Sequence, residues 1–400
     1  MTNATISQTL NQLDDKSPTY ATEFADQLLH AAVQAKTSDI HIQPTADGID
    51  VRWRIDGVLQ PVGAFSPGDQ TNVVSRLKVM ADLLTYRTDV PQEGRIRDRF
   101  DGVEMRISTF PTLFGERAVV RLFAVQNDLQ HLDQLGLDET TISRLREMLA
   151  ETTGAILITG PAGSGKTTTA YACLRELAKA SDGGRSIVSL EDPIEVAVPG
   201  VSQSQVNSSV GFDLVSGLKS MLRQDPEVML VGEMRDQVTA EVAIQAALTG
   251  QLVLTTFHAG SSVEAIGRLI DMAIEPYLVR SAVLGVLSQR LVRRLCECAA
   301  QSDDANERLG LPVEQHRIAA GCERCNHSGY RGRLVLTELL EVQASDMAGA
   351  IITNADTRAL AEFASQQGME SLWQRAITAV AAGDTSAAEV RRVLGFRSLS

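Results

Sequence analysis

The chain has 400 residues, of which 44% are hydrophobic and 4% aromatic, and its formal net charge is −13. A single hydrophobic core stops growing near roughly 250 to 300 residues, so we expect at least two domains with aliphatic cores. The acidic balance argues against a general surface for nucleic acid or anionic membranes. No apolar run approaches the roughly 18 residues that span a bilayer, and the first residues lack the features of a signal peptide, which predicts a cytosolic protein.

The N-terminal third predicts a small α/β domain. Residues 1–20 are polar and weakly patterned, which favours a flexible tail. Residues 21–36 carry apolar side chains at helical spacing, and the following SDIHIQP and IDVRWRIDGVLQPV alternate with period two. A helix near residues 72–84 then precedes further alternating strands. We therefore predict an N-terminal domain over residues 21–125 on a largely antiparallel sheet.

A polar connection over residues 126–137 predicts a linker, after which the capping residues near Asp138 begin a helix. Short apolar runs (AILIT, SIVSLED, VMLVGE and QLVLTTFH) then alternate with helical stretches, which is typical of a parallel sheet wrapped by helices. We place a second domain over residues 138–400. It includes a cysteine-containing region at 290–335 and a helical region at 346–400.

A phosphate-binding loop is the most informative motif in the chain. The loop GPAGSGKTT follows the apolar run AILIT and precedes a helical stretch. Its glycines let consecutive N–H groups turn toward a polyphosphate, and the helix directs its positive end to the same place. The lysine is expected to meet the β- and γ-phosphates, and the Thr167 hydroxyl to bind Mg²⁺. The predicted nucleotide-binding residues are Gly160, Pro161, Ala162, Gly163, Ser164, Gly165, Lys166, Thr167 and Thr168.

Three further polar residues follow predicted strands, at the edge where ligands of such sheets bind. Glu233 stands where a Walker-B acid belongs and is our candidate for orienting the water that attacks ATP, although it could be a surface helix cap. Glu191 could place that water or the Mg²⁺ shell, or simply cap a helix. His258 could contact the γ-phosphate, but a lone histidine at a strand end is as often structural.

Cysteines form two close pairs, Cys296-x-Cys298 and Cys322-x-x-Cys325, which could close a structural tetrahedral Zn²⁺ site. The tight spacing of the first pair is unfavourable for this geometry, because C-x-C side chains point to opposite sides of an extended backbone unless it bends. The alternative is a set of unligated cytosolic thiols. Cys173 is expected to pack in the core.

The motifs GPAGSGKTTT, SLEDPIE, RQDPEVMLVGEMRD and TTFHAGSS, in this order, resemble the Walker A, Asp box, Walker B and His box of the secretion ATPase superfamily that powers type II secretion and type IV pilus assembly. Further similar segments include SDIHIQP, RISTFPTLFGERAVVRLF and GCERCNHSGYRGR, so the resemblance covers roughly residues 20–395. It implies a PAS-like N-terminal domain followed by a RecA-like ATPase domain. The cysteines favour the assembly or secretion branch over the retraction branch.

The resemblance also implies a ring of six subunits, in which arginines of the N-terminal domain reach the nucleotide. Those positions fall on Arg106, Arg121 and Arg333. From the residues alone, Arg106 and Arg121 are charged positions on alternating strands, for which a solvated face is the default. An arginine fork is nevertheless suited to neutralising two phosphate oxygens at once.

The expected function is therefore that of a cytoplasmic hexameric ATPase, recruited by inner-membrane platform proteins, which uses ATP, Mg²⁺ and Zn²⁺. Because little precedes residue 20, we expect the extra domain that usually docks such ATPases to be missing. A nucleic-acid motor is the alternative, although the acidic balance and the lack of basic and aromatic tracts count against nucleic acid as a partner. A nucleotide-gated scaffold without turnover is the third possibility.

Overall fold

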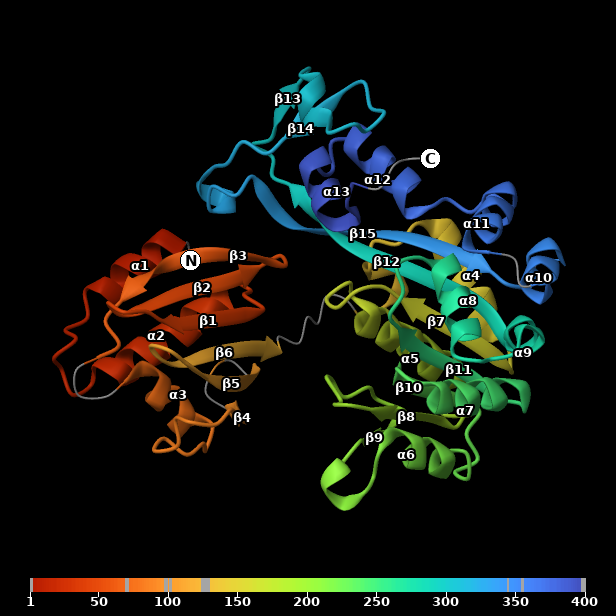
Figure 1. Ribbon diagram of the computed structural model, residues 1–400, viewed down its shortest axis with the longest axis horizontal. Coiled ribbons are helices and arrows are strands. Elements are labelled where there is room, and N and C mark those ends of the chain that lie inside the picture. Colours follow the sequence, from red (N-terminus) through yellow and green to blue (C-terminus); the bar gives the residue numbers. More distant parts are fainter. Residues whose placement is uncertain are drawn as a thin grey trace. The chain divides into compact units, whose positions relative to one another are not determined.

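The computed structural model describes residues 3–68, 72–96, 100, 103–123, 130–343, 345–353 and 356–396. The chain divides into two compact units, whose elements are labelled in Figure 1. The first unit comprises residues 1–125 with 320–332, and the second comprises residues 126–319 with 333–400. Within the described ranges, no helix combines the length and the apolar character that crossing a bilayer requires.

The sheet of the first unit has six strands in the order β3-β2-β1-β6-β5-β4, and each neighbouring pair is antiparallel. Its helices and one face of the sheet share a single apolar core around Phe24 and Trp53. The opposite face has no apolar cluster among the described residues. The elements are α1 (Asn3–Asn11), α2 (Tyr20–Gln34), β1 (Asp39–Pro44), β2 (Ile49–Ile55), β3 (Val58–Phe65), α3 (Val73–Met80), β4 (Gln92–Ile96), β5 (Glu104–Thr112) and β6 (Gly115–Phe123).

The prediction of a flexible tail over residues 1–20 is wrong for the part that the structure describes. Helix α1 lies there, and its Ile6 and Leu10 are each only 1% exposed within the core of the first unit. The side chain of Asn3 also donates a hydrogen bond to the carbonyl of Pro61 on β3 at 3.2 Å. Two apolar residues four apart are enough to anchor one face of a short helix, but they leave a sequence that is polar on average.

The sheet of the second unit has seven strands in the order β15-β12-β7-β11-β10-β8-β9, and β12, β7, β11, β10, β8 and β9 pair in parallel. Its interior strand β7 is buried on both faces: Leu157 belongs to one apolar cluster, and its neighbour Ile156 to another. A parallel sheet covered by helices on both faces is the architecture that the alternating apolar runs predict. The mixed α/β fold class is thereby confirmed.

The elements of the second unit up to the cysteine-containing region are η1 (Leu132–Gln134), α4 (Glu139–Ala150), β7 (Gly154–Thr159), α5 (Lys166–Ser181), β8 (Ile187–Glu191), β9 (Ser202–Gln205), η2 (Ser208–Val210), α6 (Leu214–Met221), β10 (Val228–Met234), α7 (Gln237–Leu248), β11 (Leu252–Phe257), α8 (Ser262–Asp271), α9 (Pro276–Ala282) and β12 (Val283–Leu295). They are followed by β13 (Ala300–Ser302), η3 (Ala305–Arg308), β14 (His316–Ile318), η4 (Glu323–Cys325), β15 (Tyr330–Glu341), α10 (Ser345–Ile352), α11 (Thr357–Gln366), α12 (Leu372–Ala381) and α13 (Ala387–Leu394). Of these, η4 and the first residues of β15 belong to the first unit.

The expected linker at 126–137 lies partly outside the described residues, which resume at residue 130. Where it is described, Leu132 of η1 is fully buried in a core cluster of the second unit. This part of the connection therefore packs on the second unit.

Candidate functional site

The phosphate-binding loop connects the carboxyl end of β7 to the start of α5. Gly160, Gly163 and Gly165 have φ values of 147°, 75° and 90°, which side chains rarely adopt. A Cβ on Gly160 would lie 2.5 Å from the carbonyl oxygen of Gln289, whereas a Cβ on Gly163 would meet nothing within 4 Å. Gly163 therefore faces open space, as a loop that receives a ligand requires.

Lys166 begins α5 and is only 9% exposed. Its Nζ donates hydrogen bonds to the carbonyls of Gly160 at 2.9 Å and Pro161 at 3.0 Å. Burial lowers the pKa of this ammonium and the charge of Arg290 lowers it further, while the carboxylate of Glu233 opposes both. The lysine is thus held against the loop, with Glu233 as its acidic neighbour. Thr167 and Thr168 occupy the next positions of the same helical turn.

Glu233 and His258 come together at the ends of two adjacent parallel strands. Strands β10 and β11 pair in parallel, with a register shift between Val231 and Met234, and His258 Nε2 lies 2.5 Å from Glu233 Oε1. Arg235 binds the other carboxylate oxygen of Glu233 through its Nε. The Glu233 side chain is 18% exposed and that of His258 48%, so both remain reachable from solvent. Glu233 is therefore no surface helix cap: the cap of the following helix α7 is Asp236.

Glu191 ends β8 and is 3% exposed, with both carboxylate oxygens occupied by protein donors. The Tyr171 hydroxyl of α5 binds Oε2, and Ser189 and Gln203 donate to Oε1 at 2.7 and 3.0 Å. Burial and the hydrogen bond to Glu191 raise the pKa of Tyr171. The sequence did not indicate Tyr171 or Gln203 as partners, because their contacts depend on how α5 and β9 pack.

The three predicted arginines lie on different strands. Arg106 of β5 and Arg121 of β6 are directly opposite each other in the antiparallel register, so they share one sheet face. Arg95 and Arg54 continue this row on β4 and β2, and Asp39 of β1 lies between Arg121 and Arg54. We call the face that these five residues mark the open arginine face. Arg333 lies exposed on β15.

The open arginine face has only one carboxylate in its central row. Arg121 Nε donates to Asp39 Oδ1 at 2.9 Å, and Arg54 Nε lies 3.5 Å from Asp39 Oδ2. The guanidinium of Arg106 lies 5.0 Å above the Phe123 ring, and its buried Nε has no hydrogen-bond partner among the described residues. Burial, aided by Arg54 and Arg117, lowers the pKa of nearby His41, whose Nδ1 is 3.0 Å from Arg117. The face is therefore electropositive.

The four paired cysteines form a cluster in which their Sγ atoms all lie within 4.8 Å of one another. The Sγ atoms of Cys322 and Cys325 are 3.8 Å apart, which is the spacing of roughly 3.8 Å that a tetrahedron with Zn–S bonds of about 2.3 Å requires. The backbone N–H groups of Cys322 and Gly329 donate to Cys325 Sγ, as they do around a thiolate ligand. The donor set fits Zn²⁺.

The tight C-x-C spacing is compatible with this cluster because the backbone bends. Residues 296–299 form a turn that is closed by a hydrogen bond from Ala299 N to Cys296 O at 2.9 Å. Cys173 is separate from the cluster: it is fully buried on α5, in an apolar core.

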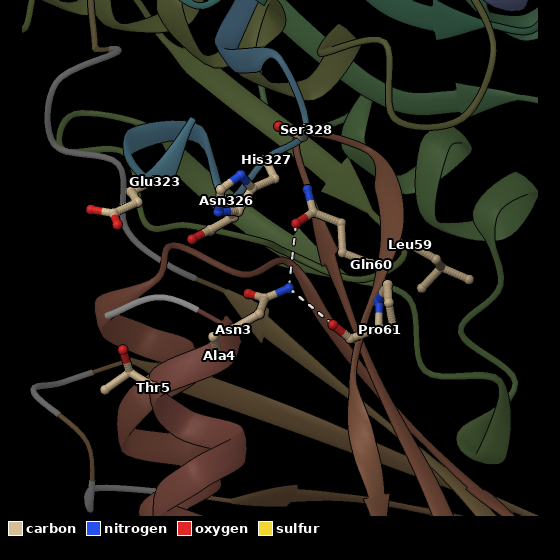
Figure 2. Close-up of a pocket in the computed structure, with 10 residues that line it drawn as sticks. All are labelled: Asn3, Ala4, Thr5, Leu59, Gln60, Pro61, Glu323, Asn326, His327 and Ser328. Carbon is tan, nitrogen blue, oxygen red and sulfur yellow. Dashed lines mark hydrogen bonds between the residues drawn. The ribbon is translucent and has the colours of Figure 1, made fainter. Parts of the chain in front are cut away.

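A hollow of about 690 Å³ in the first unit lies away from these predicted residues. It is lined by the start of α1, by residues 59–61 of β3 and by residues from 323 to 328, and Asn3 donates across it to Gln60 Oε1 at 3.4 Å (Figure 2). Its lining includes no cysteine and none of the open arginine face. We assign no chemistry to it.

The sequence profile of a family described as type II/IV secretion system protein matches residues 13–392. The chain is similar to the putative type II secretion system protein E of Escherichia coli K12, with 39% identity over 95% of this chain and 78% of that protein. It is also similar to the type II secretion system ATPase E of Vibrio cholerae, with 41% identity over 92% of this chain and 74% of that one. The type IV pilus assembly ATPase PilB of Thermus thermophilus is 38% identical over 95% of this chain, which spans 43% of its length.

Among solved structures, the Legionella pneumophila ATPase DotB aligns with a TM-score of 0.68 and 20% identity, over 92% of this chain and 95% of that one. The pilus retraction motor PilT aligns with a TM-score of 0.63 and 24% identity, over 92% and 96%. At these identities, the likeness concerns the fold.

Proposed function

The chain belongs to the type II/IV secretion system protein family and so is a secretion or pilus-assembly ATPase, and we propose that it hydrolyses Mg²⁺–ATP to drive the assembly of pilin-like subunits. The observation that carries the site assignment is the pairing of Glu233 with His258 at the strand ends next to the phosphate-binding loop.

In this proposal, some residues of the second unit bind the nucleotide and others take part in its hydrolysis. Backbone N–H groups of the loop and the ammonium of Lys166 bind the phosphates, and the Thr167 hydroxyl would hold Mg²⁺, which supplies charge neutralisation on the β- and γ-phosphates. Glu233 orients the attacking water and accepts its proton, while His258 fixes the carboxylate and faces the γ-phosphate. Glu191 acts as a positioning residue through Tyr171 and Gln203, because Tyr171 lies on helix α5, which begins at the phosphate-binding loop.

We assign Arg106, Arg121 and Arg333 to a six-subunit ring in which arginines stabilise the phosphate charge. Support comes from the open arginine face, where Arg106 Nε lacks a hydrogen-bond partner among the described residues and Arg121 is 64% exposed. A planar guanidinium suits this task because two of its N–H groups can meet two phosphate oxygens.

We further propose that the protein works at the cytoplasmic face of the inner membrane with platform proteins of a secretion or pilus system. The support is the family membership and the names of its relatives. The cysteine cluster is proposed to hold one structural Zn²⁺, since four thiolates leave no open position for water.

Substitutions at Lys166 and Glu233 test the site. Lys166→Ala removes the ammonium that meets the phosphates, so we expect ATP binding and turnover both to fall by at least about 100-fold. Glu233→Gln keeps the loop and Lys166, so binding should stay within about 3-fold of the unmodified protein while turnover falls by about 100-fold or more. Phosphate release and equilibrium binding of ATP measure the two quantities.

Glu241→Gln is the matched control, because Glu241 is an exposed glutamate on the next helix, α7. Its turnover should equal that of the unmodified protein. Turnover of the unmodified protein that equals that of Lys166→Ala would refute the enzyme assignment. Normal turnover of Glu233→Gln would require another base.

A further inference from the structure

One glutamine side chain fastens the end of the phosphate-binding loop to the helix that follows it. Gln289 lies on β12, which runs parallel to β7 with Ser288 paired to Thr159, and it is 1% exposed. Its Nε2 donates to the carbonyl of Ser164 at 2.6 Å, and its Oε1 accepts from the Thr169 hydroxyl of α5 at 3.0 Å. The amide thus joins the last turn of the loop to the first turn of the helix.

Two glycines of the loop make this close approach possible. A Cβ on Gly160 would lie 2.5 Å from the Gln289 carbonyl oxygen, and a Cβ on Gly165 would lie 3.0 Å from Gln289 Nε2. A contact below 3.0 Å to a backbone atom forces a shift of the chain. Gly160 is therefore needed for the approach of Gln289 as well as for its φ value, and a side chain at Gly165 would press on the Gln289 amide.

The next residue extends the connection to the loop that follows His258. The Arg290 side chain is buried, and its two terminal N–H groups donate to the carbonyls of Gln289 at 2.9 Å and Gly260 at 2.5 Å. The short basic run of Arg290, Arg293 and Arg294 by itself predicts a solvated helix face or a subunit contact. Arg290 instead lies within strand β12, because the apolar residues of this stretch pack on both sides of a sheet.

We propose that Gln289 and Arg290 are positioning residues, which hold the phosphate-binding loop and the His258 loop in one register across β12. This inference rests on the proposed ATPase function. Gln289 fixes the carbonyl of Ser164, so that the N–H groups of Gly165 and Lys166 converge on the phosphates. Arg290 holds Gly260, two residues after His258, and so sets how His258 meets Glu233.

The two roles predict different kinetic effects. Gln289→Met keeps the side-chain length but removes both hydrogen bonds, so the Kd for ATP should rise about 5- to 10-fold, as the loss of one or two neutral hydrogen bonds implies. Thr169→Val should also raise it, by about 5-fold. Because both changes break one connection, the double variant should be no more than about 2-fold weaker than Gln289→Met. Arg290→Lys keeps the charge but cannot span two carbonyls, so kcat should fall about 10-fold while KM stays within about 2-fold.

Calorimetric titration with Mg²⁺–ATP measures binding in a Glu233→Gln background, in which ATP is not consumed, and steady-state phosphate release measures kcat and KM for Arg290→Lys. Gln343→Met is the control, because Gln343 donates to the carbonyl of Val283 at the opposite end of the same strand. It should bind ATP normally. Circular dichroism verifies folding, and if Gln289→Met fails to fold, Thr169→Val carries the test.

Unchanged ATP binding by Gln289→Met and Thr169→Val, or fully multiplicative effects in the double variant, would overturn the role of Gln289. A rise in KM with unchanged kcat would overturn the role of Arg290. If the Glu233→Gln parent itself bound no ATP, the proposed function would fail instead, and the two failures are thereby distinguished.

Discussion

The two sheets of the molecule differ in how many of their faces are buried. The sheet of the second unit is buried on both faces, and its candidate site residues lie at the carboxyl ends of the strands, where Glu233 of β10 meets His258 just after β11. The sheet of the first unit has an apolar core on one face, and its arginines occupy the middle of the other. The comparison teaches that two-sided burial gathers the candidate site of the second unit at one sheet edge, while one-sided burial leaves the first unit a sheet face for charge.

Among the tests of this comparison, the cysteine-containing region gives the largest expected effect, because its strands are too short to form a sheet that is buried on both faces. Strands β13 and β14 have three residues each, too few to bury a core of their own. We expect about one Zn²⁺ per chain by elemental analysis, and less than about a tenth of that in Cys325→Ser, because three remaining thiolates hold the metal far less tightly.

Cys173→Ser is the matched control, since burial raises the pKa of the Cys173 thiol to about 12 and keeps it from acting as a ligand. It should leave the zinc content unchanged. Purified protein with well below one equivalent of zinc would contradict the metal assignment and leave the cluster as reduced thiols.

Substitution of Glu389 should have the next largest effect. It tests how much a buried, hydrogen-bonded carboxylate stabilises the second unit. Burial alone would raise the pKa of this carboxyl on α13, but hydrogen bonds from Arg392 and Arg293 outweigh it and lower the pKa from 4.5 to about 2. A lowered folded-state pKa stabilises the fold above the unfolded-state value, and the stabilisation is lost as the pH falls from about 4.5 to about 2. Glu389→Gln should therefore cost about 3 kcal/mol at pH 7 and progressively less below pH 4.5.

Urea unfolding, followed by fluorescence of Trp373, measures this difference, because Arg391 of α13 packs over the Trp373 ring. A Trp53→Phe background removes the second of the two tryptophans. Glu362→Gln, which affects an exposed pair with Arg358, should change stability by less than about 0.5 kcal/mol. An equal loss in both variants, or a loss that does not shrink in acid, would contradict the buried role of Glu389.

The smallest expected effect concerns the open arginine face. Asp39→Asn removes the charge that holds Arg121, which is 64% exposed, so under the proposed ring assembly we expect ATP turnover to fall only about 3-fold. Turnover is compared at matched oligomeric state. Asp50→Asn is the control, because Asp50 pairs with Arg52 on the same strand face. An equal effect of both substitutions would show that the face responds to total charge and not to the placement of Arg121.

The sequence predicted the parts of the site that lie in continuous motifs. The loop from Gly160 to Thr168 follows from its fixed residues, and the positions of Glu191, Glu233 and His258 follow from the rule that parallel strands end at one edge. The proximity of Glu233 and His258, and the fold class, could thus be inferred from the order and spacing of residues alone.

What the sequence did not predict depends on register and on packing between distant segments. Gln289 lies in an apolar stretch without a motif, and its contact with Ser164 arises from the pairing of β12 with β7. The pairing of Arg106 with Arg121 depends on the register of the β5–β6 hairpin. Helix α1 was not predicted, because Ile6 and Leu10 are its only buried residues.

The two hydrogen bonds that Lys166 makes to loop carbonyls affect what sets the affinity for a nucleotide. Two of the three N–H donors of the ammonium already reach the oxygens of Gly160 and Pro161, so an arriving phosphate competes with neutral carbonyls for it. The affinity then reports the difference between two sets of acceptors, and an oxygen that carries negative charge has the advantage over a neutral carbonyl. The loop should therefore discriminate by phosphate charge and ignore a nucleoside that offers none.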